Sequence, residues 1–253
     1  MSALWRGAGN CPPSCSRSRG LSVNLHETYR SPADLPAQVP IFPLAGALLL
    51  PRAHLPLNIF EPRYLQMIDD AMRGDRIIAM VQPNTPEGIK AQGDADVKPS
   101  VYKVGCAGRI TSFSETGDNR FLISLTGVCR LHLGVELEKQ TPYRICKADF
   151  EAFAGDLAPG RGEEDVDREA LLVAFRKFLD ANGMEADWDE VKQTPTEVLV
   201  NTLCVLSPYD AADKQAMLEA GTLKARCETL IALTEMVLAG HGPAHRTGRP
   251  TLQ

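Results

Sequence analysis

The hydrophobic pattern of this chain changes its period near residues 155–165, and that change constrains the fold more than any other feature. Before this stretch, apolar residues alternate with polar ones: Cys129, Leu131, Leu133, Val135 and Leu137. Period two is typical of a strand with one buried face. After the stretch, apolar residues recur at helical spacing: Leu171, Leu172, Phe175, Phe178 and Leu179. The sequence therefore predicts an α+β protein, with a β-rich half followed by a helical half.

The β half, residues 38–154, is expected to form a partly closed barrel of antiparallel or mixed strands. The predicted strands are Val39–Leu44, Leu55–Phe60, Arg76–Gln82, Val101–Phe113, Arg120–Glu138 and Tyr143–Phe150. The alternation in the fifth segment places Leu133 in the core and Arg130 and His132 in water. A helix beginning at Pro62 interrupts the strands, since proline suits the first helical position.

The helical half, residues 166–240, is expected to be a small bundle of four helices. The first ends at Asn182-Gly183, and the second begins at a capping box, Thr194-Pro-Thr-Glu197. A short helix near Asp210–Glu219 and a last one from Leu223 to Ala239 follow. Residues 155–165, rich in glycine and acid, are expected to be a flexible linker, and residues 241–253 a flexible tail.

The N-terminal segment differs from the rest, and residues 1–37 are predicted to be a disordered extension. Residues 1–26 contain three arginines and no acidic residue, and they lack a pattern that buries a core. Such a composition also resembles an organellar transit peptide, and translation beginning near Val23 would explain it equally well. Disorder and a later start are favoured over targeting, because Pro12, Pro13 and Gly20 interrupt any amphipathic helix.

Composition narrows the class of protein. A net charge of −5 argues against nucleic acid as a partner, because phosphate binding needs a basic patch. The apolar runs are too short to span a membrane. Seven cysteines, without a CxxC pair, indicate a reducing compartment and buried thiols rather than disulfides or zinc. We therefore expect a cytoplasmic protein.

Several segments resemble one known family in the same order. They are Pro40–Leu44, Leu55–Met67 (with Phe60-Glu-Pro-Arg-Tyr64), Val104–Ile110, Arg120–Arg130, Pro142-Tyr143 and Asp213–Glu219 followed by Arg226. Over residues 38–240 the chain is similar to the N-terminal, substrate-binding domain of Lon proteases. The resemblance implies a PUA-like β pseudobarrel followed by a C-terminal helical bundle, and a role in recognising polypeptide substrates. The N-terminal extension and the absence of downstream catalytic domains depart from the family.

The catalytic motifs considered are either absent from the sequence or lack the geometry that their chemistry requires. The sequence contains no Gly-Lys dipeptide, which a phosphate-binding loop requires, and no Gly-x-Ser-x-Gly elbow. Ser100 and Lys103 have the spacing of a serine–lysine pair, but on a strand they point to opposite faces. His241 and His245 have the spacing of a helical metal pair, but Pro243 breaks that helix.

The remaining candidates are interpreted as structural. His54 and His132 are expected to be solvated or structural. The carboxylates of Asp69-Asp70 diverge on a helix, and Glu163–Asp165 lacks the spacing of oxygen ligands. Glu61, Arg63 and Tyr64 fit either a ligand-contacting cluster or a helix start, and the helix start is favoured because capping explains the residue types. No catalytic, cofactor or metal residue is therefore assigned.

These observations favour a stand-alone, non-catalytic module that recognises unfolded or partner polypeptides. It is expected to need no cofactor, to lack ATPase and protease activity, and to have a separate protease as a further partner. The binding surface is expected at a groove between the halves and on apolar side chains that part of the Pro40–Pro56 segment exposes. The alternatives are a hydrolase with an unrecognised site, and a PUA-like RNA-binding protein.

Overall fold

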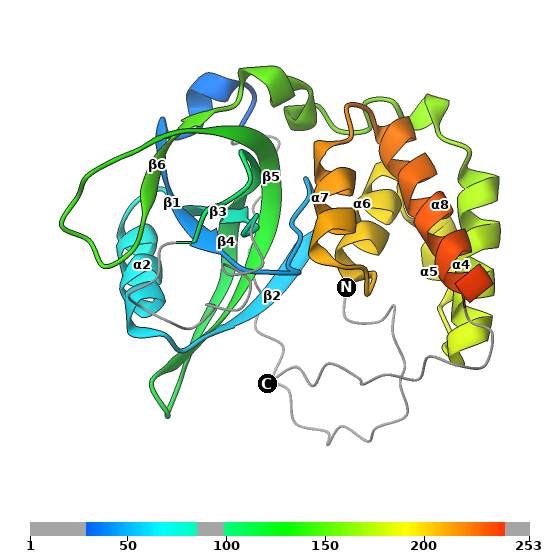
Figure 1. The fold of residues 1–253 in the computed structure, drawn as a ribbon, viewed down its shortest axis with the longest axis horizontal. Helices are drawn as coiled ribbons and strands as arrows, with labels where there is room; N and C mark the ends of the chain where they lie inside the picture. The colour runs from blue at the N-terminus through cyan, green and yellow to red at the C-terminus, as the bar shows by residue number, and fades with distance from the viewer. Residues whose placement is uncertain (1–28, 85–98, 241–253) are drawn as a thin grey trace.

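The computed structural model describes residues 29–84 and 99–240. Figure 1 shows a β half and a helical half side by side, with α2 on the side of the β half that faces away from the other helices. The β half contains η1 (Pro32–Asp34), β1 (Gln38–Pro43), β2 (His54–Ile59), α2 (Pro62–Arg73), β3 (Ile77–Val81), β4 (Val104–Thr116), β5 (Arg120–Glu136) and β6 (Ile145–Asp149).

The six strands form one mixed sheet in the order β2-β5-β4-β3-β1-β6. The strands β1 and β3 pair in parallel, and the other strand pairs are antiparallel. The early part of β5 pairs with β2, and its late part pairs with β6. Because β6 also pairs with β1, this second pairing closes β1, β3, β4, β5 and β6 into a barrel and leaves β2 at an edge. The predicted α+β fold with a β pseudobarrel is confirmed.

Both faces of the sheet are covered around β3, and every residue of this strand is buried. One face packs around Val39, Ile41 and Leu131 in a cluster that includes Tyr29 and Leu157. The other face belongs to a larger cluster that α2 and the helical half share: among its members are Phe42, Met80, Ile68, Leu199 and Met217. The two halves therefore share one hydrophobic core.

Two positions on β5 depart from the predicted alternation. Leu133 is buried and His132 exposed, as expected, but Val135 is 70% exposed. The pairing of β5 with β6 shifts register between Leu133 and Glu136, and such a bulge turns the following side chains to the other face. Arg130, expected in water, is buried, because the carboxylate of Asp156 covers it with bonds of 2.8 and 2.9 Å.

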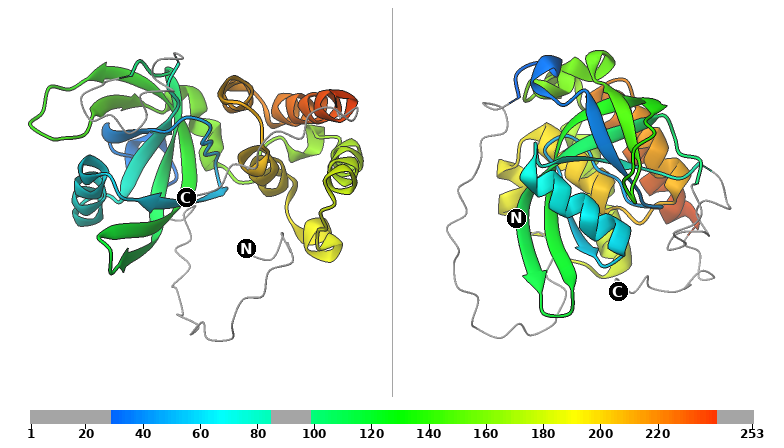
Figure 2. Two further views of the ribbon diagram at one scale, coloured as in Figure 1. Left: turned by 60° about the horizontal axis from the view of Figure 1, so that its bottom comes forward. Right: turned by 90° about the vertical axis from the view of Figure 1, so that its left-hand side faces the viewer.

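The helical half consists of η2 (Glu151–Leu157), η3 (Glu163–Asp165), α4 (Arg168–Asn182), α5 (Trp188–Gln193), α6 (Thr196–Leu206), α7 (Ala211–Glu219) and α8 (Leu223–Gly240). Figure 2 shows these helices gathered on one side of the barrel. The short α5 was not predicted. None of the helices in the described ranges has the length and hydropathy needed to cross a membrane.

The predicted capping box at the start of α6 is wrong. The hydroxyl of Thr194 donates to the carbonyl of Glu190 in the preceding helix, and Glu197 turns away to bind Arg52. The first-turn N–H of Glu197, which has no partner within the helix, instead donates to the carboxylate of Glu163 at 2.7 Å. A distant acid thus performs the capping that local sequence assigned to a neighbour.

Segments expected to be disordered or flexible also carry contacts. Within the predicted 1–37 extension, Tyr29 and Leu35 are buried, and the Tyr29 hydroxyl accepts a 2.6 Å bond from Arg109. The predicted flexible linker 155–165 contains the end of η2 and all of η3. The predicted disorder of residues 29–37 and the predicted flexible linker are therefore corrected, while residues 1–28 and 241–253 lie outside the described ranges.

The segment between β1 and β2 joins the halves instead of exposing apolar side chains. Leu48, Leu49 and Leu50 are each at most 1% exposed and belong to the shared core. Polar contacts reinforce the joint: the Asn201 amide donates to the Pro51 carbonyl at 2.9 Å, and the Lys214 ammonium donates to the Gly46 carbonyl at 2.7 Å. Part of the segment 40–56 was expected to expose apolar side chains, and this expectation does not hold for Leu48–Leu50.

Candidate functional site

The start of α2 holds the three residues that sequence analysis weighed as a cluster. Glu61 is the N-cap, and its carboxylate binds the Arg63 guanidinium at 2.8 Å. The same guanidinium lies over the Tyr64 ring, 4.7 Å from its centroid, and Tyr64 packs against Phe42 with centroids 4.3 Å apart. The predicted helix start is present, and hollows lie on two sides of Tyr64.

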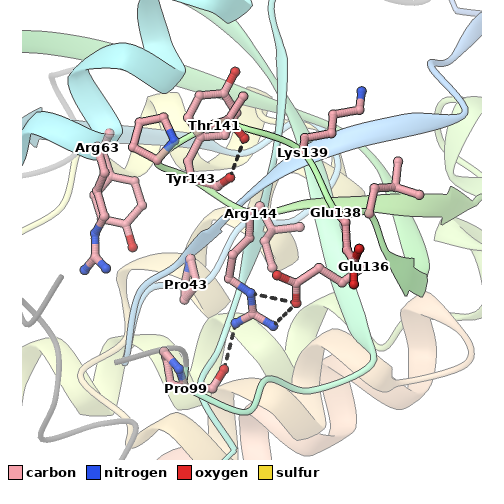
Figure 3. A pocket seen from close by; sticks show the side chains of 13 residues that line it. Pro43, Arg63, Pro99, Glu136, Glu138, Lys139, Thr141, Tyr143 and Arg144 are labelled. Carbon is pink, nitrogen blue, oxygen red and sulfur yellow. Dashed lines mark hydrogen bonds and ion pairs between the residues drawn. The ribbon is translucent and has the colours of Figure 1, made fainter. Parts of the chain in front are cut away.

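The first hollow, which we call the Arg144 pocket, lies between α2, the end of β1 and the chain from β5 to β6 (Figure 3). It has a volume of about 360 Å³. Arg144 binds Glu136 at 2.8 Å and donates to the Pro99 carbonyl at 2.7 Å. The Tyr143 hydroxyl donates to Asp70 at 2.8 Å, which fixes α2 against this chain segment. Glu136 and Arg144 in the wall are thus paired with each other, and Lys139 donates to the Gln38 side chain at 3.0 Å.

The second hollow, which we call the Asn58 slot, runs along β2 and has a volume of about 380 Å³. Its lining residues are mostly apolar: Phe42, Pro43, Leu44, Leu57, Asn58, Ile59, Phe60, Glu61 and Tyr64. Phe60 is 56% exposed at its rim. The side-chain oxygen of Asn58 is buried and has no donor among the described residues. A buried acceptor without a donor is costly, so a ligand that supplies an N–H or O–H would be favoured here.

The two hollows share Pro43 and Tyr64 in their walls, so they are adjacent. We call them together the Tyr64 groove. Its lining combines apolar surface with a few paired charges and one unpaired acceptor, which is the usual character of a binding groove. Burial raises the pKa of Tyr64, and burial with the bond to Asp70 raises the pKa of Tyr143 to about 12. Both phenols are therefore neutral near pH 7; the O–H of Tyr143 is already donated to Asp70, whereas that of Tyr64 can donate to a ligand.

Acid–base chemistry is poorly supported by the described side chains. The hydroxyl of Thr126 lies 2.9 Å from His54 Nδ1, the contact of a nucleophile with a base, and burial lowers the pKa of His54. However, Thr126 is 6% exposed, so a substrate carbonyl has little access to it. Ser100 and Lys103 are exposed on a non-helical stretch.

The other candidates have structural surroundings. His132 is exposed, with its ring 4.9 Å from that of Phe153. Asp70 binds Tyr143, and Glu163 caps α6. Residues 29–84 and 99–240 contain no group of three His, Cys, Asp or Glu side chains arranged for a metal ion. His241 and His245 lie outside the described residues.

The junction between the halves also contains a hollow, of about 330 Å³, but its walls are not apolar as expected. Most of its lining side chains are charged or polar, among them Arg130, Asp156, Glu197 and Arg226. Arg130 is bonded to Asp156, and Glu197 to Arg52. These groups hold the halves together, so we place the candidate site in the Tyr64 groove instead.

Comparison with known families shows which family the chain belongs to. The profile of the ATP-dependent protease La (LON) substrate-binding domain matches residues 38–235. The chain belongs to this family. Among curated proteins, it is 26% identical to Lon protease 2 of Myxococcus xanthus and 27% identical to the Lon protease of Anaeromyxobacter dehalogenans, each over 79% of this chain. It spans 24% and 23% of the length of these two relatives.

Solved structures of Lon N-terminal domains share the fold. The Lon N-terminal domain protein from Xanthomonas campestris aligns with a TM-score of 0.54 at 19% identity, over 78% of this chain and 98% of that one. The N-terminal domain of the Mycobacterium avium complex Lon protease aligns with a TM-score of 0.53 at 14% identity over the same shares. The resemblance inferred from Phe60-Glu-Pro-Arg-Tyr64 and the ordered segments is confirmed.

Sequence reasoning on this Lon-type domain found part of the groove and missed the rest. It singled out Glu61, Arg63 and Tyr64 but gave Asn58 no role. A polar residue between Leu57 and Ile59 in an otherwise apolar run was the available signal. The Glu136–Arg144 pair, eight residues apart in sequence, depends on how β5 and β6 meet and had no local signal.

Proposed function

We propose that this chain binds extended segments of unfolded or partner polypeptides in the Tyr64 groove. The observation that carries the proposal is the Asn58 slot, where an apolar wall surrounds a buried amide oxygen that lacks a donor. A polypeptide supplies both of the required groups, since it has apolar side chains and a main-chain N–H at nearly every residue. Membership of the Lon substrate-binding family supports the same class of ligand.

We also propose that the binding is not coupled to catalysis by this chain. The sequence contains no Gly-Lys dipeptide for a phosphate-binding loop, and the Thr126 hydroxyl, which contacts His54, belongs to a buried residue. Proteolysis of a bound polypeptide would then be carried out by a separate protease. Purified protein is expected to turn over neither ATP nor peptide bonds. Magnesium-dependent ATP hydrolysis that a point substitution in this chain abolishes would contradict the proposal.

The binding site is tested by titrating the full chain into fluorescein-labelled, reduced and carboxymethylated α-lactalbumin, which stays unfolded. Phe60 is 56% exposed at the groove, and Val173 is 54% exposed on α4. These two residues make a matched pair, because either can be replaced without opening the core. Phe60→Ser is expected to weaken binding about tenfold, the loss typical of an interface anchor. Val173→Ser is expected to leave the affinity unchanged.

Urea unfolding of both variants is the control for stability, and equal midpoints are expected. Chemical-shift changes should gather on residues that line the Tyr64 groove. Equal affinity for Phe60→Ser and the parent chain would show that the groove is not the site. An absence of binding up to high micromolar concentration would contradict the function itself.

A further inference from the structure

We propose that the bound polypeptide segment adds a strand to the free edge of β2, so that recognition runs mainly through main-chain hydrogen bonds. This inference rests on the proposed function and specifies how the same groove would hold its ligand. Strand addition to an open sheet edge binds many sequences, because the donors and acceptors belong to the backbone.

The position of β2 in the sheet leaves one of its edges open. Of the described strands, β2 pairs with β5 alone, through six consecutive residues from His54 opposite Thr126 to Ile59 opposite Phe121. The ring of strands closes through β5 and β6, so β2 lies outside it. An edge strand with unpaired N–H and C=O groups is a ready template for another strand.

The phase of the ladder shows which main-chain groups face outwards. The Gly127 N–H donates to the Ala53 carbonyl at 2.9 Å, directly before β2 begins. Since bonds to one neighbour recur at every second residue of an antiparallel strand, Leu55, Leu57 and Ile59 direct their main-chain groups at β5. The main-chain groups of His54, Pro56 and Asn58 therefore point to the open side. No main-chain bond from these three to a loop or turn is recorded within residues 29–84 and 99–240.

The Asn58 slot follows this open edge. Successive side chains of a strand point to opposite faces, so Leu57 and Ile59 share a face that Asn58 does not. A hollow lined by all three residues fits a position along the edge, where both faces of the strand are reached. A segment paired with β2 would then place alternate side chains against the apolar wall and a donor near the Asn58 amide oxygen, which has no partner among the described residues.

Proline at position 56 favours a foreign segment over a second copy of this chain. Pro56 has no N–H, so the open edge offers donors at His54 and Asn58 only. Two copies paired across a two-fold axis at this residue would face one proline with the other, and neither would supply a donor there. An incoming segment supplies its own N–H to the Pro56 carbonyl, which makes it the better occupant.

The test uses the full chain and a fluorescein-labelled peptide of alternating valine and serine, with a methyl group placed on one backbone nitrogen at a time. Methylation should weaken binding about fivefold to tenfold at every second residue and leave the residues between them nearly unaffected, because only one set of N–H groups faces β2. Amide hydrogen exchange at His54 and Asn58 should slow on binding.

Variants of the protein give a second readout that leaves the β2–β5 ladder intact. Asn58→Pro removes an outward N–H and should weaken binding of the unmethylated peptide. Pro56→Ala adds an outward N–H and should leave that binding at least as strong. Equal sensitivity to methylation at all positions would overturn strand addition while leaving the proposed function standing. Peptide binding that disappears as the protein self-associates would assign the edge to a second copy. Failure of both peptide and unfolded α-lactalbumin to bind would instead refute the proposed function.

Discussion

The guanidinium group of Arg52 binds the carboxylate of Glu197, which lies 145 residues further along the chain. The bond from Arg52 Nε is 2.8 Å long, and the same carboxylate accepts the Gly160 N–H at 2.8 Å. One acid on α6 therefore ties together the segment before β2, the segment after η2 and the helical half. Arg52 adopts a φ of 65°, which is uncommon for a residue with a side chain. The residue that forms the ion pair with Glu197 thus also has an unusual backbone conformation.

Glu197→Gln is expected to lower the free energy of unfolding by about 3–5 kcal/mol, because it leaves the Arg52 charge largely buried without its counter-ion. The side chains of the pair are only 11% and 9% exposed. The measurement is the urea midpoint. Asp189→Asn is the control, since the Asp189–Lys192 pair is 87% and 67% exposed and such pairs contribute about 0–1 kcal/mol. Equal losses for the two variants would contradict a structural role for the Arg52–Glu197 pair.

Gly127→Ala is expected to destabilise the protein by at least about 2 kcal/mol through overpacking. The segment before β2 crosses β5 at this residue, and an added Cβ would lie 2.0 Å from the Leu50 carbonyl oxygen. Gly117→Ala, at the tip of the β4–β5 hairpin, meets nothing within 4 Å and should be nearly neutral. Thermal melts of the two variants compare them directly. A Gly127→Ala melting temperature equal to that of the parent would contradict this close crossing.

Leu133→Asp and Val135→Asp should differ sharply although both residues belong to the alternating apolar set. Leu133 is 7% exposed, and a carboxylate buried there should cost more than about 3 kcal/mol. Val135 is 70% exposed beyond the bulge, so Val135→Asp should change the free energy of unfolding by no more than about 0.5 kcal/mol. The same small effect is expected for His132→Asp. Urea midpoints decide the matter. A large loss of stability for Val135→Asp would show that Val135 is buried and would contradict the bulge.

His54 should make stability depend on pH in the mildly acidic range. Burial lowers its pKa in the folded protein below the ordinary value of 6.5. As pH falls through 6.5, the unfolded chain therefore takes up a proton that the folded chain does not, and the free energy of unfolding decreases. His54→Gln should remove this part of the slope, seen as the difference between the two proteins in urea midpoints measured on both sides of pH 6.5. Parallel profiles would show that His54 titrates normally.

Local patterns predicted the strands and long helices well, because they depend on neighbours in sequence. The alternation before Leu133 and the helical stripe after Leu171 identified the two halves. Proline at position 62 marked the start of α2. The Asn182-Gly183 cap marked the end of α4, where Gly183 has a φ of 61°.

Predictions failed where a distant segment competed for a group. Thr194 and Glu197 have the spacing of a capping box, but a buried arginine from the β half draws Glu197 away and Glu163 takes over the cap. Arg130 has the position of a solvated side chain, but Asp156 on η2 buries it. At Glu197 the buried pair with Arg52 replaces a capping bond worth about 1 kcal/mol, and at Arg130 the pair with Asp156 replaces solvation by water.

The main strands, the long helices, their order and the family could be predicted from local properties of the chain: its periodicity, its prolines and the Phe60-Glu-Pro-Arg-Tyr64 segment. The position of the proposed binding groove depends on tertiary contacts instead. The closure of the barrel between β5 and β6 leaves β2 at an edge, and the packing of α2 beside it creates the slot around Asn58. These features arise from contacts between segments far apart in sequence, which no local pattern records.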